Sequence, residues 1–215
     1  MDDYRSARMA MIDSQLRASG VMDRGILSAM AELPRELFVA EHRRPVAYVD
    51  DVQPLAHGRF LLSPSQFARI AQLAKIAPTD RVLDVGTASG YSAAILSRQA
   101  REVVAAEHVE QLGQLARKNI ETLGVGTVSV VSTDDALATS GQFDAIIVEG
   151  ALDGEPGDLL KLLAPNGRLV APILKRGVAV VGTYSRGDRG VMFTSAFDAT
   201  MPRLRNDVVD DEFRF

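Results

Sequence analysis

The chain has 215 residues, 47% hydrophobic and 24% charged, a composition typical of a soluble globular protein with one sizeable core. A net charge of -4 gives no basis for non-specific binding to nucleic acid or to an acidic membrane, and the lack of cysteine excludes disulfides and thiol catalysis. A polar N-terminus and the absence of long apolar runs predict a cytoplasmic protein with no membrane partner.

The N-terminal part, 1–80, is expected to form a helical extension with one long irregular loop. Met9–Ala18 and Arg24–Leu33 have amphipathic helical patterns. From Pro45 to Pro64 the apolar residues follow no period, and a loop of this length is usually functional. We predict that it faces a substrate; the alternative is a cover over one sheet edge. A helix resumes at Ser65, and its apolar stripe, expected in the core, is Phe67, Ile70, Ala71 and Ala74.

The segment Val82–Tyr91 reads as a strand, a tight loop and a helix start. An apolar run stops at Asp84 and Gly86, and Gly90 opens an alanine-rich helix. The two glycines let the backbone approach a ligand closely, and the helix start offers unpaired N–H groups. Because Asp84 stands where its strand ends, we expect it in the ligand crevice of an open α/β sheet.

The glycine spacing in this loop separates two kinds of cofactor. The dinucleotide pattern G-x-G-x-x-G requires glycine at three positions that here hold Gly86, Ala88 and Tyr91. The run instead resembles the D/E-x-G-x-x-x-G loop of Rossmann-like methyltransferases that use S-adenosylmethionine (SAM). For the loop taken alone, a turn that binds no ligand remains the alternative.

Acidic residues recur at the ends of the next two predicted strands. Glu107 ends the run Val103–Glu107, about 20 residues past the loop, where a carboxylate can accept both hydroxyls of a ribose. A solvated glutamate is the alternative. Asp134 and Asp135 follow the strand at Val128–Val131 and either accept from an adenine amino group or cap the next helix.

Strands and helices alternate through this half of the chain. Further strands are expected at Phe143–Gly150 and within Leu163–Val170, and helical patterns lie at Val109–Leu123 and Pro156–Leu163. This alternation predicts an α/β fold with a doubly wound, mostly parallel sheet.

The C-terminal part is predicted to close the sheet with an antiparallel hairpin. Val178–Tyr184 and Val191–Phe197 flank the turn residues Ser185–Gly190. The last four residues, Glu212–Phe215, are expected to return their aromatic rings to the body. The predicted core domain therefore spans 81–215.

Six stretches together resemble the protein-L-isoaspartate O-methyltransferase family. They are Met11–Leu16, Leu33–Val39, Ala47–Asp50, the loop Asp84–Tyr91, the strand that begins Phe143-Asp144, and Pro165–Val170, in the order and spacing of that family. The resemblance implies a Rossmann-like methyltransferase fold, SAM as cofactor, and methyl transfer to isoaspartyl carboxylates in damaged proteins or peptides.

The resemblance also implies where SAM is held, in the loop and at the strand ends. The predicted cofactor-binding residues are Asp84, Gly86, Thr87, Ala88, Ser89, Gly90, Tyr91, Glu107, His108, Asp134, Asp135 and Glu149. SAM carries the reactive methyl group, and a carboxylate acceptor is already ionised near neutral pH, so no general base is required. The three histidines follow no metal-ligand spacing, and no metal is predicted. His57 can act as a base only for a hydroxyl or amine acceptor; the alternative is an exposed loop residue.

The substrate-facing run departs from the family pattern. The family carries G-x-G-Q-T-I-S-Q-P, whose Thr and Ser face the substrate, whereas this chain has Arg59, Phe60, Leu62 and Ser63 at the Gln, Thr, Ser and second Gln positions. Losing two hydroxyls weakens discrimination for a polar substrate. Ser63 can restore one hydroxyl, and Arg59 can pair a substrate carboxylate or stay solvated. Arg59, Leu62 and Ser63 are the predicted substrate-contacting positions.

Three functions remain open from the sequence. The first is isoaspartyl methyl transfer. The second is methyl transfer to another acceptor, either a small-molecule carboxylate or a different protein site, which the Phe60 and Leu62 replacements favour. The third is a SAM-binding regulatory or scaffold protein without catalysis. The oligomeric state is not predicted.

Overall fold

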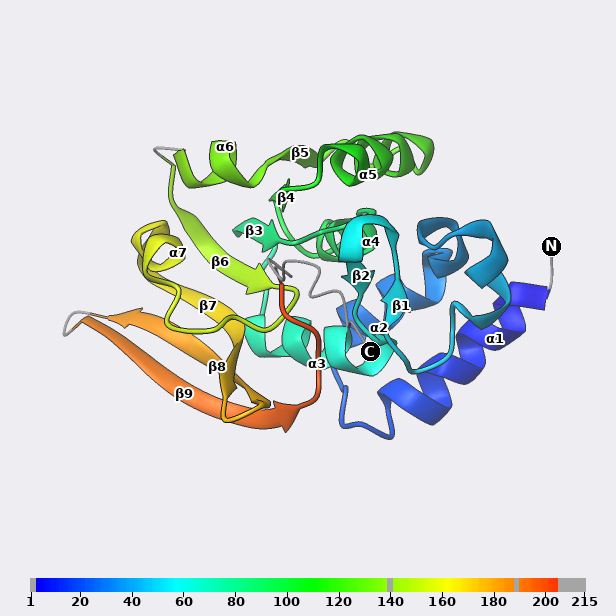
Figure 1. Cartoon of the computed structure of the whole chain (residues 1–215), viewed down its shortest axis with the longest axis horizontal. Helices are drawn as coiled ribbons and strands as arrows, with labels where there is room; N and C mark the ends of the chain where they lie inside the picture. The colour runs from blue at the N-terminus through cyan, green and yellow to red at the C-terminus, as the bar shows by residue number, and fades with distance from the viewer. Residues whose placement is uncertain (1–2, 139–140, 188–189, 205–215) are drawn as a thin grey trace, which may run out of the picture.

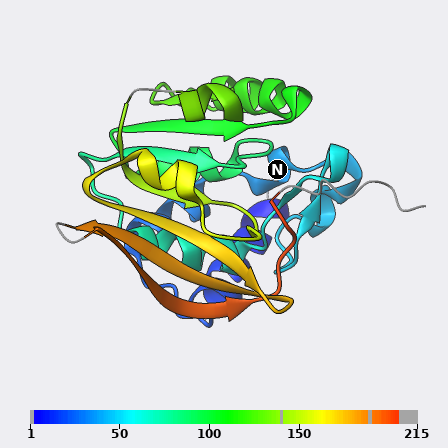
Figure 2. The same ribbon diagram turned by 60° about the vertical axis from the view of Figure 1, so that its left-hand side comes forward.

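The computed structural model describes residues 3–138, 141–187 and 190–204. Its centre is a seven-stranded sheet in the order β5-β4-β3-β6-β7-β8-β9 (Figures 1 and 2). The strands are β3 (Arg81–Val85), β4 (Glu102–Glu107), β5 (Val128–Ser132), β6 (Phe143–Val148), β7 (Leu163–Lys175), β8 (Val178–Gly187) and β9 (Gly190–Ala199). The first five are parallel, and β8 and β9 continue from β7 as antiparallel neighbours. The predicted α/β fold, with an antiparallel C-terminal hairpin, is confirmed.

Helices cover both faces of this sheet. They are α1 (Asp3–Met11) with a π-helical turn η1 (Ile12–Leu16), α2 (Arg24–Glu32), α3 (Pro64–Ala74), α4 (Tyr91–Leu96), α5 (Glu110–Thr122), α6 (Thr133–Ala138) and α7 (Gly157–Lys161). Successive strand residues point to opposite faces, so Val82 packs with the cluster of α2, α3 and α4 while Leu83 packs with that of α6 and α7. This two-sided burial explains the continuous apolar runs of the parallel strands.

The N-terminal segment differs from the expected pattern in its details. The first helix begins at Asp3 rather than Met9, and Arg8 fixes it by donating to the Tyr48 hydroxyl at 2.8 Å and to backbone carbonyls at the end of α2. The hydropathy pattern of the sequence gives no indication of these tertiary contacts. The predicted core stripe of α3 is fully buried.

The irregular run between α2 and α3 consists of short elements. They are the 3-10 helices η2 (Arg35–Phe38), η3 (Glu41–Val46) and η4 (Ala56–Gly58) and the two-residue strands β1 (Gln53–Pro54) and β2 (Phe60–Leu61). β1 and β2 pair as an antiparallel hairpin, too short to show a period in the sequence. Both views place this hairpin at the edge toward which the parallel strands point (Figures 1 and 2).

The C-terminal hairpin is longer than predicted. β8 and β9 extend into the expected turn and pair as far as Gly187 with Gly190. The predicted helix before β7 is shorter than its pattern, because Leu163 already pairs with Phe143. The expectation for Glu212–Phe215 lies outside the described residues. Within the described part of the chain, no helix has the length and apolar content needed to cross a membrane.

Candidate active site

Three neighbouring parallel strands bring three acidic side chains to one edge of the sheet. Asp84 is the next-to-last residue of β3, Glu107 ends β4, and Glu149 directly follows β6. All three are buried, with Asp84 fully enclosed and Glu107 and Glu149 exposing 2% and 5% of their surface. A cluster of buried carboxylates is expensive to maintain unless it binds something, so this edge is the candidate site.

Asp84 and Glu149 form a closely interacting pair. Asp84 Oδ2 accepts a 2.7 Å hydrogen bond from the Ser92 hydroxyl, whereas Asp84 Oδ1 and Glu149 Oε1 have no hydrogen-bond partner among the described residues. Burial, followed by the charge of Asp84, raises the pKa of Glu149 well above its ordinary value. Burial also raises the pKa of Asp84 to about 6. Two buried acceptors without a partner are suited to the ammonium group of an amino acid ligand.

The glycine loop turns tightly around this pair. Gly86, Ala88 and Gly90 all have left-handed backbone angles, with φ of 88°, 52° and 94°. The Gly86 N–H donates to the Ala106 carbonyl at 2.9 Å, which ties the loop to β4. Ala88 adopts its conformation despite a Cβ, at a cost of about 1 kcal/mol.

Glu107 receives hydrogen bonds from several directions. The backbone N–H groups of Ala88, His108 and Val109 donate to it at 2.8, 3.0 and 3.1 Å. Arg59 donates to it through Nε and Nη2, both at 3.2 Å, so the two side chains form a bidentate ion pair. The predicted ribose-binding carboxylate therefore already has a partner from within the chain.

Arg59 is buried, with 3% of its surface exposed. Besides Glu107, its guanidinium donates to the Leu204 carbonyl at 2.6 Å and to the Gly86 carbonyl at 3.0 Å. A methyl group built on Gly86 would collide with the Leu204 side chain and with Arg59 Nη2. Arg59 and Leu204 thus cover the loop where the sequence predicts the cofactor.

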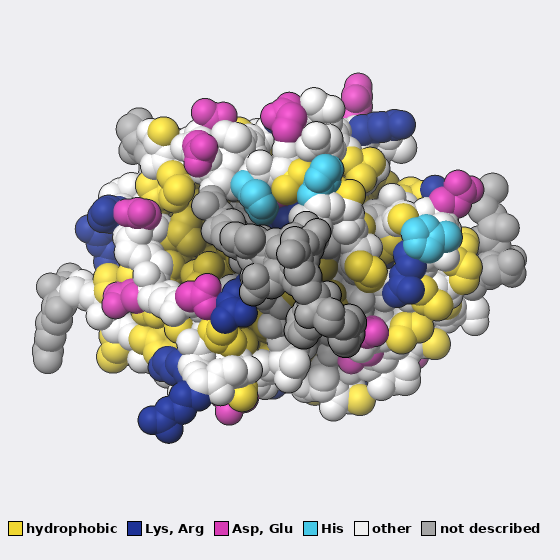
Figure 3. Space-filling view, in the orientation of Figure 1, with side chains coloured by type: hydrophobic (Ala, Val, Ile, Leu, Met, Phe, Trp, Pro, Cys, Tyr) yellow, Lys and Arg dark blue, Asp and Glu magenta, His cyan; other side chains and the backbone are white. Residues whose placement is uncertain are grey.

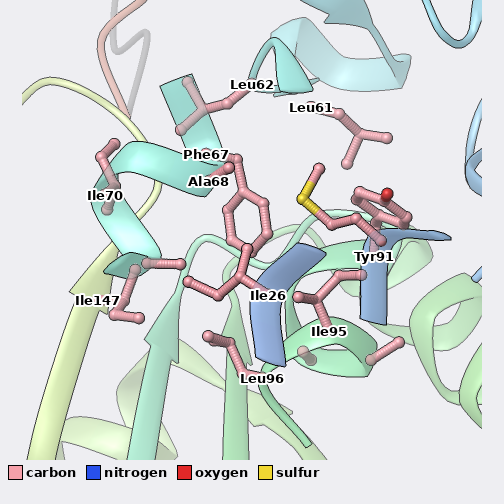
Figure 4. Close-up of a cluster of buried hydrophobic side chains, with 14 of the residues drawn as sticks. Ile26, Leu61, Leu62, Phe67, Ala68, Ile70, Tyr91, Ile95, Leu96 and Ile147 are labelled. Carbon is pink, nitrogen blue, oxygen red and sulfur yellow. The ribbon is translucent and has the colours of Figure 1, made fainter. Parts of the chain in front are cut away.

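The other two substrate-loop positions lie away from the carboxylates. Leu62 is 1% exposed and belongs to the apolar cluster that also contains Phe67 and Tyr91 (Figure 4). Ser63 caps α3, where its hydroxyl accepts from the Gln66 N–H at 3.4 Å. Of the three positions, only Arg59 reaches the acidic crevice.

The remaining predicted cofactor residues divide into two groups. Thr87 and Ser89 are buried in the loop, and Ser89 donates to the Phe38 carbonyl at 2.7 Å. The ring of Tyr91 packs in the apolar core cluster (Figure 4). Asp134 and Asp135, by contrast, are exposed at the start of α6.

A cavity of about 370 Å³ opens beside the crevice. Its lining includes Gly86, Leu204, His108 and Thr133, together with residues 152–159, which lead into and begin α7. Its volume falls within the range of about 300–1,000 Å³ that is usual for small-molecule sites. The face drawn in Figure 3 carries basic and acidic side chains interspersed among its described residues.

Comparison with known proteins decides the family. The family model described as Protein-L-isoaspartate(D-aspartate) O-methyltransferase matches residues 6–200. The chain belongs to this family. A protein-L-isoaspartate O-methyltransferase of Koribacter versatilis is 42% identical over 168 residues, 77% of this chain and 76% of that protein. One of Protochlamydia amoebophila is 41% identical, over 76% and 79% of the two chains.

Solved structures agree on the fold. A structure of a protein-L-isoaspartate O-methyltransferase superposes with a TM-score of 0.78 at 25% identity, over 91% of this chain and 65% of that chain. A second, from Plasmodium falciparum and described as putative, is in complex with S-adenosyl-L-homocysteine (SAH). It gives a TM-score of 0.76 at 22% identity, over 92% and 98% of the two chains.

The crevice fits SAM in the chemistry of its donors and acceptors. The unpartnered oxygens of Asp84 and Glu149 suit an ammonium group, and Glu107 has the chemistry for a ribose diol. Arg59 is an obstacle to ribose binding, because it already donates to both oxygens of Glu107. Sequence reasoning missed Leu204 altogether, because nothing in its local sequence marks a residue that covers a site far upstream in the chain.

Proposed function

We propose that this chain is a SAM-dependent O-methyltransferase that methylates isoaspartyl carboxylates in proteins or peptides. The observation that carries the proposal is the convergence of Asp84, Glu107 and Glu149 behind the Gly86 loop, beside a cavity of small-molecule size. The names of its relatives and the SAH in the Plasmodium falciparum structure support the same function. We further propose that 81–215 forms the SAM-binding core and 1–80 the acceptor side.

Each part of the crevice has a task in this proposal. When bound, SAM supplies an electrophilic methyl group. In this proposal Asp84 and Glu149 accept from its ammonium group and Glu107 accepts from its ribose. His108 lines the cavity, and Asp134 follows the lining residue Thr133 at the start of α6, where it would accept from the adenine amino group. The acceptor carboxylate is ionised near neutral pH, so the protein has only to hold it in line with the methyl group and exclude water.

The test is methyl transfer from labelled SAM to an isoaspartyl peptide, with the normal aspartyl peptide as its matched control. We expect label on the isoaspartyl peptide alone. SAH binding measured on the same sample separates loss of cofactor from loss of acceptor. Binding without transfer to either peptide would reject the isoaspartyl assignment.

A second candidate is methyl transfer to a different acceptor. It is favoured by the burial of Leu62 and Phe60, because the two positions that carry hydroxyls in the family here hold apolar side chains that face the core. Turnover with a panel of small carboxylic acids, and none with the isoaspartyl peptide, would support it. SAH binding with no acceptor methylated would instead indicate a non-catalytic SAM-binding protein.

A further inference from the structure

Glu107 has no capacity left for an additional ligand. A carboxylate offers about four lone-pair sites on its two oxygens. Here three backbone N–H groups and two N–H groups of Arg59 already donate to them, at 2.8 to 3.2 Å, and the ring Nδ1 of His108 lies 3.1 Å from Oε1. A ribose diol would bring two more donors to the same oxygens, so at least one present donor has to leave.

Arg59 is the one side chain in the described residues that donates to both oxygens of Glu107, so its departure frees both. The ring of His108 lies near Oε1 alone, and the remaining donors are backbone groups of Ala88, His108 and Val109, fixed by the loop and by the start of α5. Arg59 instead reaches Glu107 on a long side chain from the short segment between η4 and β2. Its guanidinium also donates to the Gly86 carbonyl, so its departure uncovers the loop as well.

The charge of Arg59 makes the competition strong. The pair is almost fully enclosed, with side-chain exposures of 2% for Arg59 and 0% for Glu107. Charge-assisted bidentate contacts of this kind are among the strongest hydrogen bonds in proteins. Glutamine, which the family pattern has at this position, has neither the positive charge nor the two parallel N–H donors of the guanidinium.

We propose that Arg59 is an internal competitor for the cofactor: SAM binds only after the Arg59 side chain has left Glu107, and this exchange sets the affinity of the protein for SAM and SAH. The inference rests on the proposed function, because it requires that Glu107 binds the ribose. The apparent dissociation constant for the cofactor equals the intrinsic constant divided by the fraction of molecules in which Glu107 is available, so a small fraction weakens binding. Weakening the Arg59 contact therefore strengthens cofactor binding.

The test is calorimetric titration of SAH into the full-length wild-type protein, Arg59→Gln and the control Arg43→Gln. Arg43 is also partly buried in the N-terminal segment, but it donates to Gln53 instead of the crevice. We expect Arg59→Gln to bind SAH about tenfold or more tightly than wild type. Arg43→Gln should bind like wild type.

The outcomes separate this inference from the proposed function. SAH affinity in Arg59→Gln that is equal to or weaker than wild type overturns the inference alone. Failure of all three proteins to bind SAH overturns the proposed function, and the inference with it.

A second measurement needs no variant, in case Arg59→Gln does not fold. In the wild-type protein the Arg59 Nε–H donates to buried Glu107, so its NMR signal should exchange slowly with water. Saturation with SAH should abolish this protection. An Arg59 signal unchanged at saturating SAH overturns the inference.

Discussion

The acidic crevice and the run from Ala56 to Ser63 meet through Arg59 at one edge of the sheet, yet they compare differently with what the sequence predicts. The crevice has the predicted loop and carboxylates, with Asp84 and Glu107 near the ends of their strands. The run from Ala56 to Ser63 has turned inward, so that Leu62 packs in the core and Arg59 fills the crevice. This difference shows that the local sequence determines the conformation of a strand–loop–helix unit. In an irregular segment, by contrast, tertiary contacts decide which side chains face the site.

The largest effect is expected from removing the Glu107 carboxylate, which joins the two regions through its ion pair with Arg59. Glu107→Ala should abolish SAH binding and lower the free energy of unfolding by about 3–5 kcal/mol, because Arg59 is left as an unpaired buried charge. Urea unfolding measures the loss. Glu102→Ala, in the same strand but in a partly exposed pair with Arg81, should cost at most about 1 kcal/mol. Equal losses in the two variants would contradict the role of the buried pair.

The inward orientation of the substrate-facing run predicts the next largest effect. Leu62→Ser should lower the free energy of unfolding by about 2–5 kcal/mol, because it leaves a cavity and a hydroxyl in the core. Leu37→Ser, at a surface leucine that is 42% exposed, is the control and should change stability by about 0.5 kcal/mol or less. If Phe60→Thr with Leu62→Ser instead gained isoaspartyl activity at unchanged stability, the run would face the acceptor.

The pH dependence of stability reports how strongly burial affects the Asp84 carboxyl group. Burial raises the pKa of Asp84 from 3.8 to about 6, so its contribution to stability is fully present below pH 3.8 and is lost as the pH rises through about 6. The difference in unfolding free energy between wild type and Asp84→Asn should therefore fall by up to about 3 kcal/mol over this window. Chemical unfolding at a series of pH values tests this. A difference that stays constant with pH would show that Asp84 is not desolvated.

The smallest expected effect distinguishes two adjacent acids at the start of α6. Asp134→Ala should weaken SAH binding by about three- to tenfold if Asp134 accepts from the adenine amino group. Asp135 is already hydrogen-bonded to Ser132, with its Oδ2 accepting from the hydroxyl at 2.7 Å. Asp135→Ala should therefore lower stability by about 1 kcal/mol and leave SAH affinity unchanged. If Asp135→Ala weakened SAH binding and Asp134→Ala did not, Asp135 would be the residue that accepts from the adenine amino group.

The sequence predicts the sheet and the meeting of Asp84 with Glu107 better than it predicts the surroundings of Arg59 and Leu62. Alternating apolar runs and helical periods are local signals, and the carboxyl ends of adjacent parallel strands necessarily meet, so Asp84 and Glu107 could be placed together. The partner of Glu107 could not be predicted, because an arginine in an irregular loop reads as solvated and its contact spans 48 residues. Leu62 likewise gives no local sign of whether it faces a substrate or the core.

The hydrogen bond from Arg59 to the Leu204 carbonyl joins positions 145 residues apart and has a consequence for synthesis. During translation, Arg59 and Glu107 leave the ribosome long before Leu204 does, so they can pair while the surface over Gly86 is still open. Closure over this glycine then follows the pairing of Arg59 with Glu107, because it requires residue 204. A nascent chain halted before residue 204 would present Gly86 without its Leu204 cover.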